Sequence, residues 1–207
     1  LFRKNKVDWI KGWGHIDGPG KVTVTDSAGG KTELTAKDII IATGSEPTPL
    51  PGVDIDNQRI LDSTGALSLS EVPKHLVVIG AGVIGLELGS VWRRLGAQVT
   101  VVEFLDRICP GVDVEAGKTL QRSLSKQGIT FNLSSKVTNA ISSASGVQLS
   151  IEPAAGGTAE LLEADYVLVS IGRRPYTQGL GLENVSLATD KRGMLANKGH
   201  RTEAAGV

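Results

Sequence analysis

The first 45 residues alternate between polar and apolar positions in the manner of β-strands with one exposed face. Residues 21–26 and 31–36 both carry this alternation, and the residues SAGG between them favour a tight turn, so we predict a β-hairpin. Residues 38–43, DIIIAT, are mostly apolar and β-branched, which is typical of a strand covered on both faces. The prolines and glycines of TGSEPTPLPG then indicate a loop or a connection between domains.

The pattern changes after a short helical stretch predicted at residues 63–69. Residues 75–80 are predicted to form a buried strand and residues 98–104 a second one. Between them, residues 83–96 have the apolar spacing of a helix that packs on a sheet. This strand–helix–strand order indicates parallel strands joined by a helical crossover.

An amphipathic helix is predicted over residues 113–127, because Asp113 is a favourable N-cap and Gly128 occupies the C-terminal capping position. Strand-like segments follow at residues 129–133, 136–141, 146–151, 158–163 and 165–172. Alternating strands and helices followed by a β-meander predict an α/β fold. Its core is expected to be a Rossmann-like parallel sheet, with antiparallel strands added to it.

Composition and charge narrow the classes of function. Apolar residues make up 40% of the chain, and 22 basic residues balance 22 acidic ones, so no net charge favours nucleic acid or an anionic membrane. No apolar run approaches the roughly 20 residues that cross a bilayer. The single cysteine, Cys109, excludes an internal disulfide and fits a reducing compartment. Since no targeting segment is visible, we expect the cytoplasm or the mitochondrial matrix.

The junction between the strand at 75–80 and the following helix carries the clearest candidate chemistry. Gly80, Gly82 and Gly85 form the pattern G-x-G-x-x-G, which is weak evidence alone but lies here between a predicted strand and a predicted helix. In a dinucleotide-binding turn, these glycines would permit in order the tight turn, the close approach of a pyrophosphate, and close helix packing. The helix N-terminus would offer free N–H groups to the phosphates. The alternative is that the glycines serve only a tight turn.

Glu103 stands at the end of the next predicted strand, 18 residues after Gly85. A carboxylate there accepts hydrogen bonds from the ribose hydroxyls and repels a 2′-phosphate, so the expected ligand is NAD rather than NADP. The alternative is that Glu103 is a solvated strand end. Arg107 follows closely and could favour NADP, but we assign it to the surface.

Several longer segments, taken in order, resemble the pyridine nucleotide–disulfide oxidoreductases, and among them the dihydrolipoyl dehydrogenase group. These segments are IIIATGSEPTPLPG, STGALSLSEVPK, VVIGAGVIGLELGSVWRRLGAQVTVVEF, GKTLQRSLSKQG and VLVSIGRRPYTQGLGLE. The resemblance covers essentially the whole chain. It implies one Rossmann-like domain for FAD and another for NAD, with the NAD-binding domain inserted into the FAD-binding domain.

The resemblance also implies a division of the chain. Residues 1–45 would be the C-terminal part of the first FAD-binding section, and residues 46–175 the NAD-binding domain. Residues 176–207 would begin the return to the FAD-binding and central domains. Because the chain starts at Leu1 rather than at a methionine, we expect it to be an internal segment of a longer protein.

The site residues that the resemblance implies form two sets. Those expected to bind NAD are Gly80, Ala81, Gly82, Val83, Ile84, Gly85, Leu86, Glu87, Glu103, Val137 and Gly172. Those expected to bind FAD are Gly14, Thr43, Gly44 and Ser45. Without the family, Val137 is predicted to be a core residue, Gly14 a strand bulge, the ATGS segment an interdomain turn and Glu87 a surface cap of the helix start. In relatives, the glutamate matching Glu87 pairs with a lysine beside the flavin, and that lysine lies outside this sequence.

No catalytic group of the implied reaction lies in this sequence. The family passes electrons from dihydrolipoyl groups to an enzyme disulfide, then to FAD and, as hydride, to NAD, using two cysteines spaced C-x4-C and a His–Glu pair. Cys109 has no partner cysteine. The histidines lack the surroundings of a general base; they are His15, His75 and His200. No cluster has metal-ligand spacing, so no metal is expected.

Three functions stay open. The favoured hypothesis is a segment of an FAD- and NAD-dependent dihydrolipoyl dehydrogenase. Its expected partners are the lipoyl-carrying subunits of a 2-oxo-acid dehydrogenase or glycine-cleavage complex, and its expected assembly is a homodimer. The alternatives are a disulfide reductase of the glutathione or mercuric type, which would prefer NADP, and a non-catalytic nucleotide-binding module.

Overall fold

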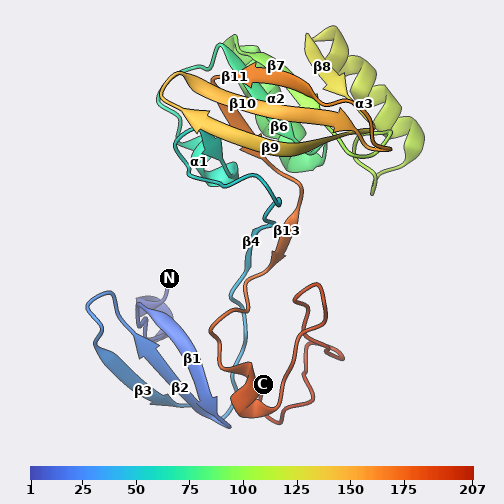
Figure 1. Cartoon of the computed structure of the whole chain (residues 1–207). Helices are drawn as coiled ribbons and strands as arrows, with labels where there is room; N and C mark the ends of the chain where they lie inside the picture. The colour runs from blue at the N-terminus through green and yellow to red at the C-terminus, as the bar shows by residue number, and fades with distance from the viewer. The chain divides into compact units, whose positions relative to one another are not determined.

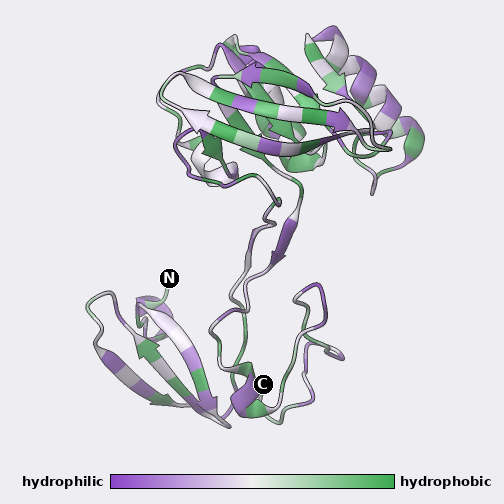
Figure 2. Cartoon of the chain, in the orientation of Figure 1, coloured by the Kyte–Doolittle hydropathy of each residue, from purple (hydrophilic) through white to green (hydrophobic).

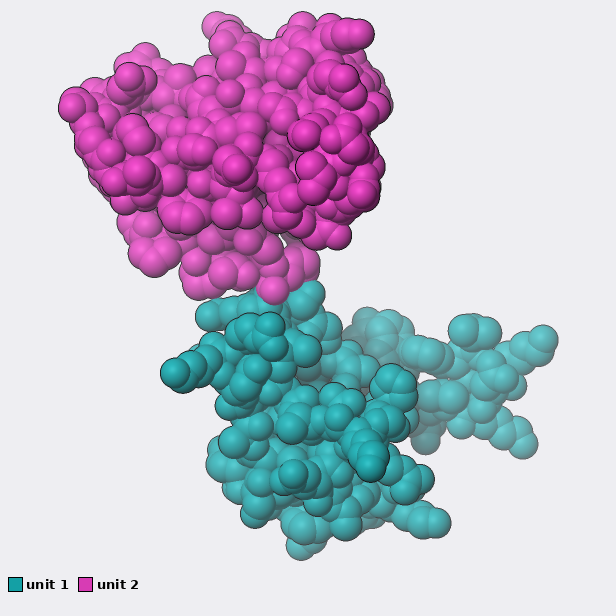
Figure 3. All heavy atoms as spheres, turned by 90° about the vertical axis from the view of Figure 1, so that its right-hand side faces the viewer, with its two compact units in different colours: residues 1–46, 174–207 teal, residues 47–173 magenta.

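The computed structural model describes residues 1–207, and the chain divides into two compact units. The smaller unit comprises residues 1–46 and 174–207, and the larger unit comprises residues 47–173, as Figure 3 shows. The larger unit is therefore one continuous insertion between the two parts of the smaller unit. None of the helices has the length and apolar character needed to span a membrane.

A five-stranded parallel sheet lies at the centre of the larger unit (Figure 1). Its strands, in order across the sheet, are β5 (Ile60–Leu61), β12 (Tyr166–Val169), β6 (His75–Ile79), β7 (Gln98–Val102) and β8 (Ile129–Asn132). Every neighbouring pair runs parallel. Alternate residues of a strand face opposite sides of its sheet. Leu76 and Val78 of β6 accordingly belong to one core cluster, and Val77 and Ile79 belong to another.

Helices cover one face of this sheet. They are α1 (Ser63–Leu67), α2 (Val83–Leu95), which follows β6, and α3 (Val114–Lys126), which follows β7. Leu86 of α2 and Leu124 of α3 are buried in the same cluster as Leu76 and Val78. The mixed colour of α3 in Figure 2 agrees with a helix that buries one side only.

The predicted caps of α3 are confirmed. The Asp113 carboxylate accepts hydrogen bonds from the backbone N–H groups of Glu115, at 3.0 Å, and Ala116, at 3.1 Å. Gly128 follows the helix with a φ of +91°, the conformation that ends a helix and that glycine adopts most readily. The hydrogen bonds to Asp113 fix where α3 begins, and the conformation of Gly128 fixes where it ends.

An antiparallel meander covers the other face of the parallel sheet (Figure 1). Its strands are β9 (Ser135–Ser143), β10 (Gly146–Pro153) and β11 (Glu160–Ala164), in the order β11-β10-β9. Val137 and Leu149 of the meander pack with Val77 of the parallel sheet. The predicted α/β fold, with a parallel core and an antiparallel addition, is confirmed. The short edge strand β5 was not predicted.

The smaller unit contains a three-stranded antiparallel sheet. It consists of β1 (Trp13–Gly18), β2 (Lys21–Thr25) and β3 (Lys31–Thr35), and it confirms the predicted hairpin between β2 and β3. Ile16 of β1 packs on the 3₁₀ helix η2 (Leu182–Val185), whereas η1 (Arg3–Asn5) buries no residue.

Two connecting segments join the units. They form the two-stranded sheet of β4 (Ser45–Pro47) and β13 (Arg173–Pro175). The Glu46 carboxylate pairs with the Arg174 guanidinium at 2.7 Å. The outgoing and returning chain are therefore tied together where they leave the smaller unit.

Residues 38–43 form no strand, so that prediction is wrong. A strand buried on both faces needs paired strands at its sides and a packed layer on each face. The sheet of this unit ends at β3, and the Ile39 N–H donates instead to the Gly206 carbonyl at 2.7 Å. Ile40 is 89% exposed. The segment has strand propensity but no neighbouring strand to pair with.

Candidate functional site

The turn between β6 and α2 requires its first glycine. Gly80 adopts a φ of +101°, which residues with a side chain rarely adopt. A Cβ at this position would also lie 2.6 Å from the Ser170 carbonyl oxygen, just beyond β12. The Gly80 N–H donates to the Val102 carbonyl at 2.8 Å, which holds the turn against the end of β7.

Gly82, the N-cap of α2, borders open space. A Cβ at Gly82 would meet no atom within 4 Å. No side chain caps the helix start, and the first N–H groups of a helix have no acceptor within it. Free donors, the positive end of the helix dipole and the room that a Cβ would otherwise fill together fit a phosphate group.

Gly85 lies buried in the first turn of α2. A Cβ there would lie 2.5 Å from the Gly80 carbonyl oxygen and 3.0 Å from Cγ1 of Val78. Its absence lets the helix approach the strand closely. Each of the three glycines thus has its own steric reason, and of the three only Gly82 faces open space.

The half-buried Glu103, which follows β7, contacts the glycine turn directly. Oε2 of Glu103 accepts a hydrogen bond from the Ala81 N–H at 2.6 Å, and Oε1 accepts one from the Leu105 N–H at 2.9 Å. A carboxylate has about four lone-pair sites, so both oxygens can still accept a further hydrogen bond. The structure therefore brings Glu103 and the glycine turn together, and the carboxylate is already oriented.

Cys109 contributes to the turn through its backbone. Its N–H donates to the Ala81 carbonyl at 2.9 Å, and its φ is +46°. The thiol is buried, and this burial, together with the negative charge of Glu103, raises the pKa of Cys109. A raised pKa keeps the thiol protonated and unreactive. Sequence reasoning missed this backbone contact, because nothing in the sequence indicates how the loop after β7 folds back.

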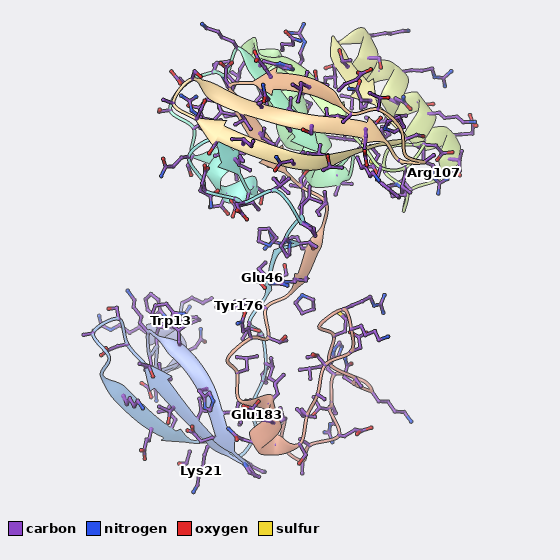
Figure 4. The ribbon with its side chains drawn as sticks, viewed as in Figure 1. Trp13, Lys21, Glu46, Arg107, Tyr176 and Glu183 are labelled. Carbon is purple, nitrogen blue, oxygen red and sulfur yellow. The ribbon has the colours of Figure 1, made fainter.

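Arg107 lies on the exposed loop after β7 (Figure 4). Its guanidinium donates to the Pro110 carbonyl at 3.1 Å. It also lines a hollow of about 630 Å³ between this loop and the start of α3. Arg107 is thus a surface residue whose side chain is bound to its own loop.

The other residues expected to bind NAD lie around the same edge of the sheet. Val83, Ile84, Leu86 and Glu87 belong to the start of α2, where Leu86 is buried and Glu87 is exposed. Gly172 follows β12 with a φ of +130°.

Val137, on β9, is a core residue, as expected without the family. It lies two residues after Ser135, whose N–H donates to the Glu103 carbonyl at 2.9 Å. Val137 also pairs with Ile151 of β10, and the residue is only 6% exposed.

The residues expected to bind FAD belong to the smaller unit. The Thr43 hydroxyl donates to the Tyr176 carbonyl at 2.5 Å, and the Tyr176 N–H donates to the Gly44 carbonyl at 3.0 Å. These contacts and the adjoining strand, which begins at Ser45, fix the connecting segment on which Tyr176 and Glu46 are labelled in Figure 4. Gly14 lies on β1 opposite Val24, and the irregularity of that ladder falls between Ile16 and Gly18, so Gly14 is not a bulge residue.

None of the histidines belongs to the glycine turn: His15 and His200 lie in the smaller unit, and His75 begins β6, whereas the glycine turn follows its other end. His15 contacts the Asp17 carboxylate at 3.0 Å on β1, and His200 is an exposed turn residue. The His75 ring contacts the Thr100 hydroxyl and the Glu163 carbonyl, both at 2.9 Å, at the amino end of β6. No group of three His, Cys, Asp or Glu residues is placed to hold a metal ion.

A parallel sheet, a glycine turn that opens a helix and a carboxylate after the adjacent strand define a dinucleotide-binding fold of the Rossmann class. The sequence profile described as pyridine nucleotide-disulphide oxidoreductase matches residues 1–207. The chain belongs to the pyridine nucleotide-disulphide oxidoreductase family.

Individual relatives agree with this assignment. The chain is 74% identical over its whole length to a protein named dihydrolipoyl dehydrogenase 3 from Pseudomonas putida, and it spans 44% of that relative. It is 52% identical to a mitochondrial dihydrolipoyl dehydrogenase from Pisum sativum, again over 100% of this chain and 42% of the relative. The chain therefore spans less than half the length of these relatives.

Among solved structures, LpdA from Mycobacterium tuberculosis superimposes with a TM-score of 0.88 at 29% identity, over 99% of this chain and 45% of that one. A flavoprotein disulfide reductase from Escherichia coli, RclA, superimposes with a TM-score of 0.84 at 28% identity, over 97% and 44%. The resemblance inferred from the sequence is confirmed.

Proposed function

We propose that this chain supplies the NAD site and part of the FAD site of a dihydrolipoyl dehydrogenase. The observation that carries the proposal is the glycine turn: open space at Gly82 and uncapped helix N–H groups adjoin an oriented carboxylate at Glu103. High identity to dihydrolipoyl dehydrogenases over the whole chain supports the same conclusion.

In this proposal the larger unit holds NAD by two kinds of contact. N–H groups at Gly82 and at the start of α2 receive the diphosphate, because the backbone there is open and the helix dipole is favourable. The oxygens of Glu103 receive the two ribose hydroxyls, because each has a lone pair beyond the one used by the backbone. The same carboxylate repels a 2′-phosphate, so NAD is preferred to NADP. Gly172 and the backbone of Val137 would complete the site.

The smaller unit would contribute to the FAD site through Gly14 and through Thr43, Gly44 and Ser45. FAD supplies the hydride transfer between a thiol–disulfide pair and NAD. This chain contains one cysteine, buried and with a raised pKa, so the redox-active disulfide and its base would be contributed by other parts of the protein. The role of these residues is binding.

The same proposal names the partners and the compartment. A dihydrolipoyl dehydrogenase acts on lipoyl-carrying subunits of a multienzyme complex and works as a homodimer, and we extend both to the protein that contains this chain. Relatives come from bacteria and from mitochondria, which supports the bacterial cytoplasm or the mitochondrial matrix.

Fluorescence titration of the chain with NADH and NADPH, together with turnover by the full-length protein, tests the proposal. We expect NADH to bind more tightly than NADPH, because Glu103 repels the additional phosphate. The full-length protein should reduce NAD with dihydrolipoamide. A clear preference for NADPH would instead favour a glutathione- or mercuric-type reductase, and absent turnover with dihydrolipoamide would leave only a nucleotide-binding function.

A further inference from the structure

We propose that Ser170 is a positioning residue which, with Glu103, fixes the Gly80–Ala81 peptide and thereby aims the diphosphate-binding N–H groups. The inference rests on the proposed NAD site. It assigns to Ser170 a role that the glycine pattern alone does not contain. It also gives Glu103 a second role, in addition to contact with the ribose.

The carbonyl side of this peptide faces Ser170. The Ser170 hydroxyl lies 3.3 Å from the Ile79 carbonyl oxygen and 3.4 Å from the Gly80 carbonyl oxygen, and it donates toward both. The Ser170 N–H also donates to the Ile79 carbonyl at 2.8 Å, which anchors the residue against the end of β6. A Cβ on Gly85 would collide with the Ser170 hydroxyl. The third glycine of the pattern therefore makes room for this hydroxyl as well as for the Gly80 carbonyl.

The N–H side of the same peptide faces Glu103. The Ala81 N–H donates to Oε2 of Glu103 at 2.6 Å, a short bond to a charged acceptor, and such bonds are stronger than neutral ones. The Ala81 carbonyl in turn accepts from the Cys109 N–H at 2.9 Å. Rotation of the Gly80–Ala81 peptide would break the contacts on both sides at once.

The next N–H group along the chain is that of Gly82, where the backbone meets open space. Its direction depends on the orientation of the preceding residues, which the contacts with Ser170, Glu103 and Cys109 hold. The ribose-binding carboxylate and the diphosphate-binding turn are thus parts of one hydrogen-bonded network. Loosening the network should weaken contact with the diphosphate specifically.

The test compares ligands that reach different parts of the site. NADH affinity is measured by fluorescence, and inorganic pyrophosphate and adenosine are measured as competitors. Ser170→Ala is expected to lower the affinities for NADH and pyrophosphate by about threefold to tenfold, which is the effect of losing one hydrogen bond. The affinity for adenosine should stay unchanged. Ser143→Ala is the matched control, because its hydroxyl donates to the Gly146 carbonyl at 3.1 Å within the meander. The control should change none of the three affinities.

A second pair of variants examines the Glu103 side. Glu103→Gln and Glu103→Ala both remove the charge, but only the glutamine retains an oxygen that can accept from the Ala81 N–H. We expect pyrophosphate to bind about threefold to tenfold more weakly to Glu103→Ala than to Glu103→Gln. Because the charge is absent from both, this difference reports the hold on the turn.

The outcomes separate the positioning role from the NAD site itself. If the unsubstituted chain binds no NADH, the proposed function fails and the positioning role fails with it. If it binds NADH, and Ser170→Ala with an unchanged melting temperature binds NADH and pyrophosphate as tightly, only the positioning role is overturned. If Ser170→Ala melts at a lower temperature, the Glu103 pair decides whether a fixed Gly80–Ala81 peptide matters for diphosphate binding. Equal pyrophosphate affinities of Glu103→Gln and Glu103→Ala then overturn the proposal that contacts on this peptide aim the diphosphate-binding N–H groups.

Discussion

Gly82 and Gly85 lie three residues apart on the same turn, yet their missing side chains have different consequences. A methyl group at Gly82 would enter open space, whereas one at Gly85 would collide with the Gly80 carbonyl and Val78. Gly82→Ala should therefore leave the melting temperature unchanged. It should weaken the binding of NADH about tenfold, because the methyl group occupies the space through which the diphosphate reaches the backbone. Gly85→Ala should lose about 1–3 kcal/mol of unfolding free energy through overpacking.

Thermal unfolding and NADH titration of the two variants check this contrast. An unstable Gly82→Ala chain would mean that the turn itself requires this glycine. Unchanged NADH affinity in Gly82→Ala would show that no diphosphate comes close to the backbone there.

Glu103 provides a second prediction, on the choice between nucleotides. Glu103→Arg should weaken the binding of NADH by about tenfold or more. The ribose hydroxyls lose their hydrogen-bond acceptor, and the Ala81 N–H loses the same acceptor. NADPH should be affected less, because the arginine attracts the 2′-phosphate. Parallel titrations with both nucleotides measure the two changes, and an equal loss for both would contradict the ribose role of Glu103.

The sequence predicted the glycines and Glu103 because these residues have a fixed spacing in a strand–turn–helix unit. It did not predict Ser170 or the Cys109 N–H as neighbours of that turn. Both reach it from distant parts of the chain, Ser170 by way of β12 and Cys109 by a loop that folds back. Local patterns contain no information about such approaches, because the order of the strands in the sheet decides the first and the path of a loop decides the second.

Among the elements, α3 has a start that depends on one side chain. Asp113 caps two N–H groups with a single carboxylate oxygen. Asp113→Ala should lower the free energy of unfolding by about 1 kcal/mol, and Asp113→Asn, which retains an acceptor, should lose less. Urea denaturation of both variants measures the difference, and equal losses would show that the carboxylate does not act as a cap.

Most helices and strands of the larger unit were predicted from the spacing of apolar residues, because their side chains pack against elements nearby in the chain. Residues 75–79 and 98–102 are strands as expected, and α2 spans Val83–Leu95 within its predicted range. The strand predicted at residues 38–43 is absent for a physical reason. An apolar run indicates that burial of the segment is favourable, but a buried strand also needs neighbouring strands to pair with. The edge strand β5 was not predicted, because a strand of two residues is too short to show an alternation of polar and apolar positions.

At the scale of the whole molecule, the two units differ in how complete their cores are. Both large apolar clusters lie entirely within residues 47–173. The cluster of the smaller unit contains three buried residues, Ile16, Leu182 and Val185. The larger unit therefore has the core of an independent domain.

A chain of residues 47–173 alone should therefore unfold cooperatively and bind NADH with the affinity of the 207-residue chain. Urea denaturation followed by circular dichroism, together with NADH titration, checks this. A broad, non-cooperative transition would mean that the larger unit depends on the smaller one for its stability, and weaker NADH binding would place part of the site outside residues 47–173.

The two backbone bonds to Glu103 also limit how the coenzyme choice of this protein could be redesigned. Replacing that single side chain to admit a phosphorylated coenzyme would leave the Ala81 and Leu105 N–H groups without their acceptor. An engineered variant would need a second substitution that supplies a new acceptor to those donors. Evolutionary conversion between the two coenzymes should therefore proceed through paired changes rather than through one.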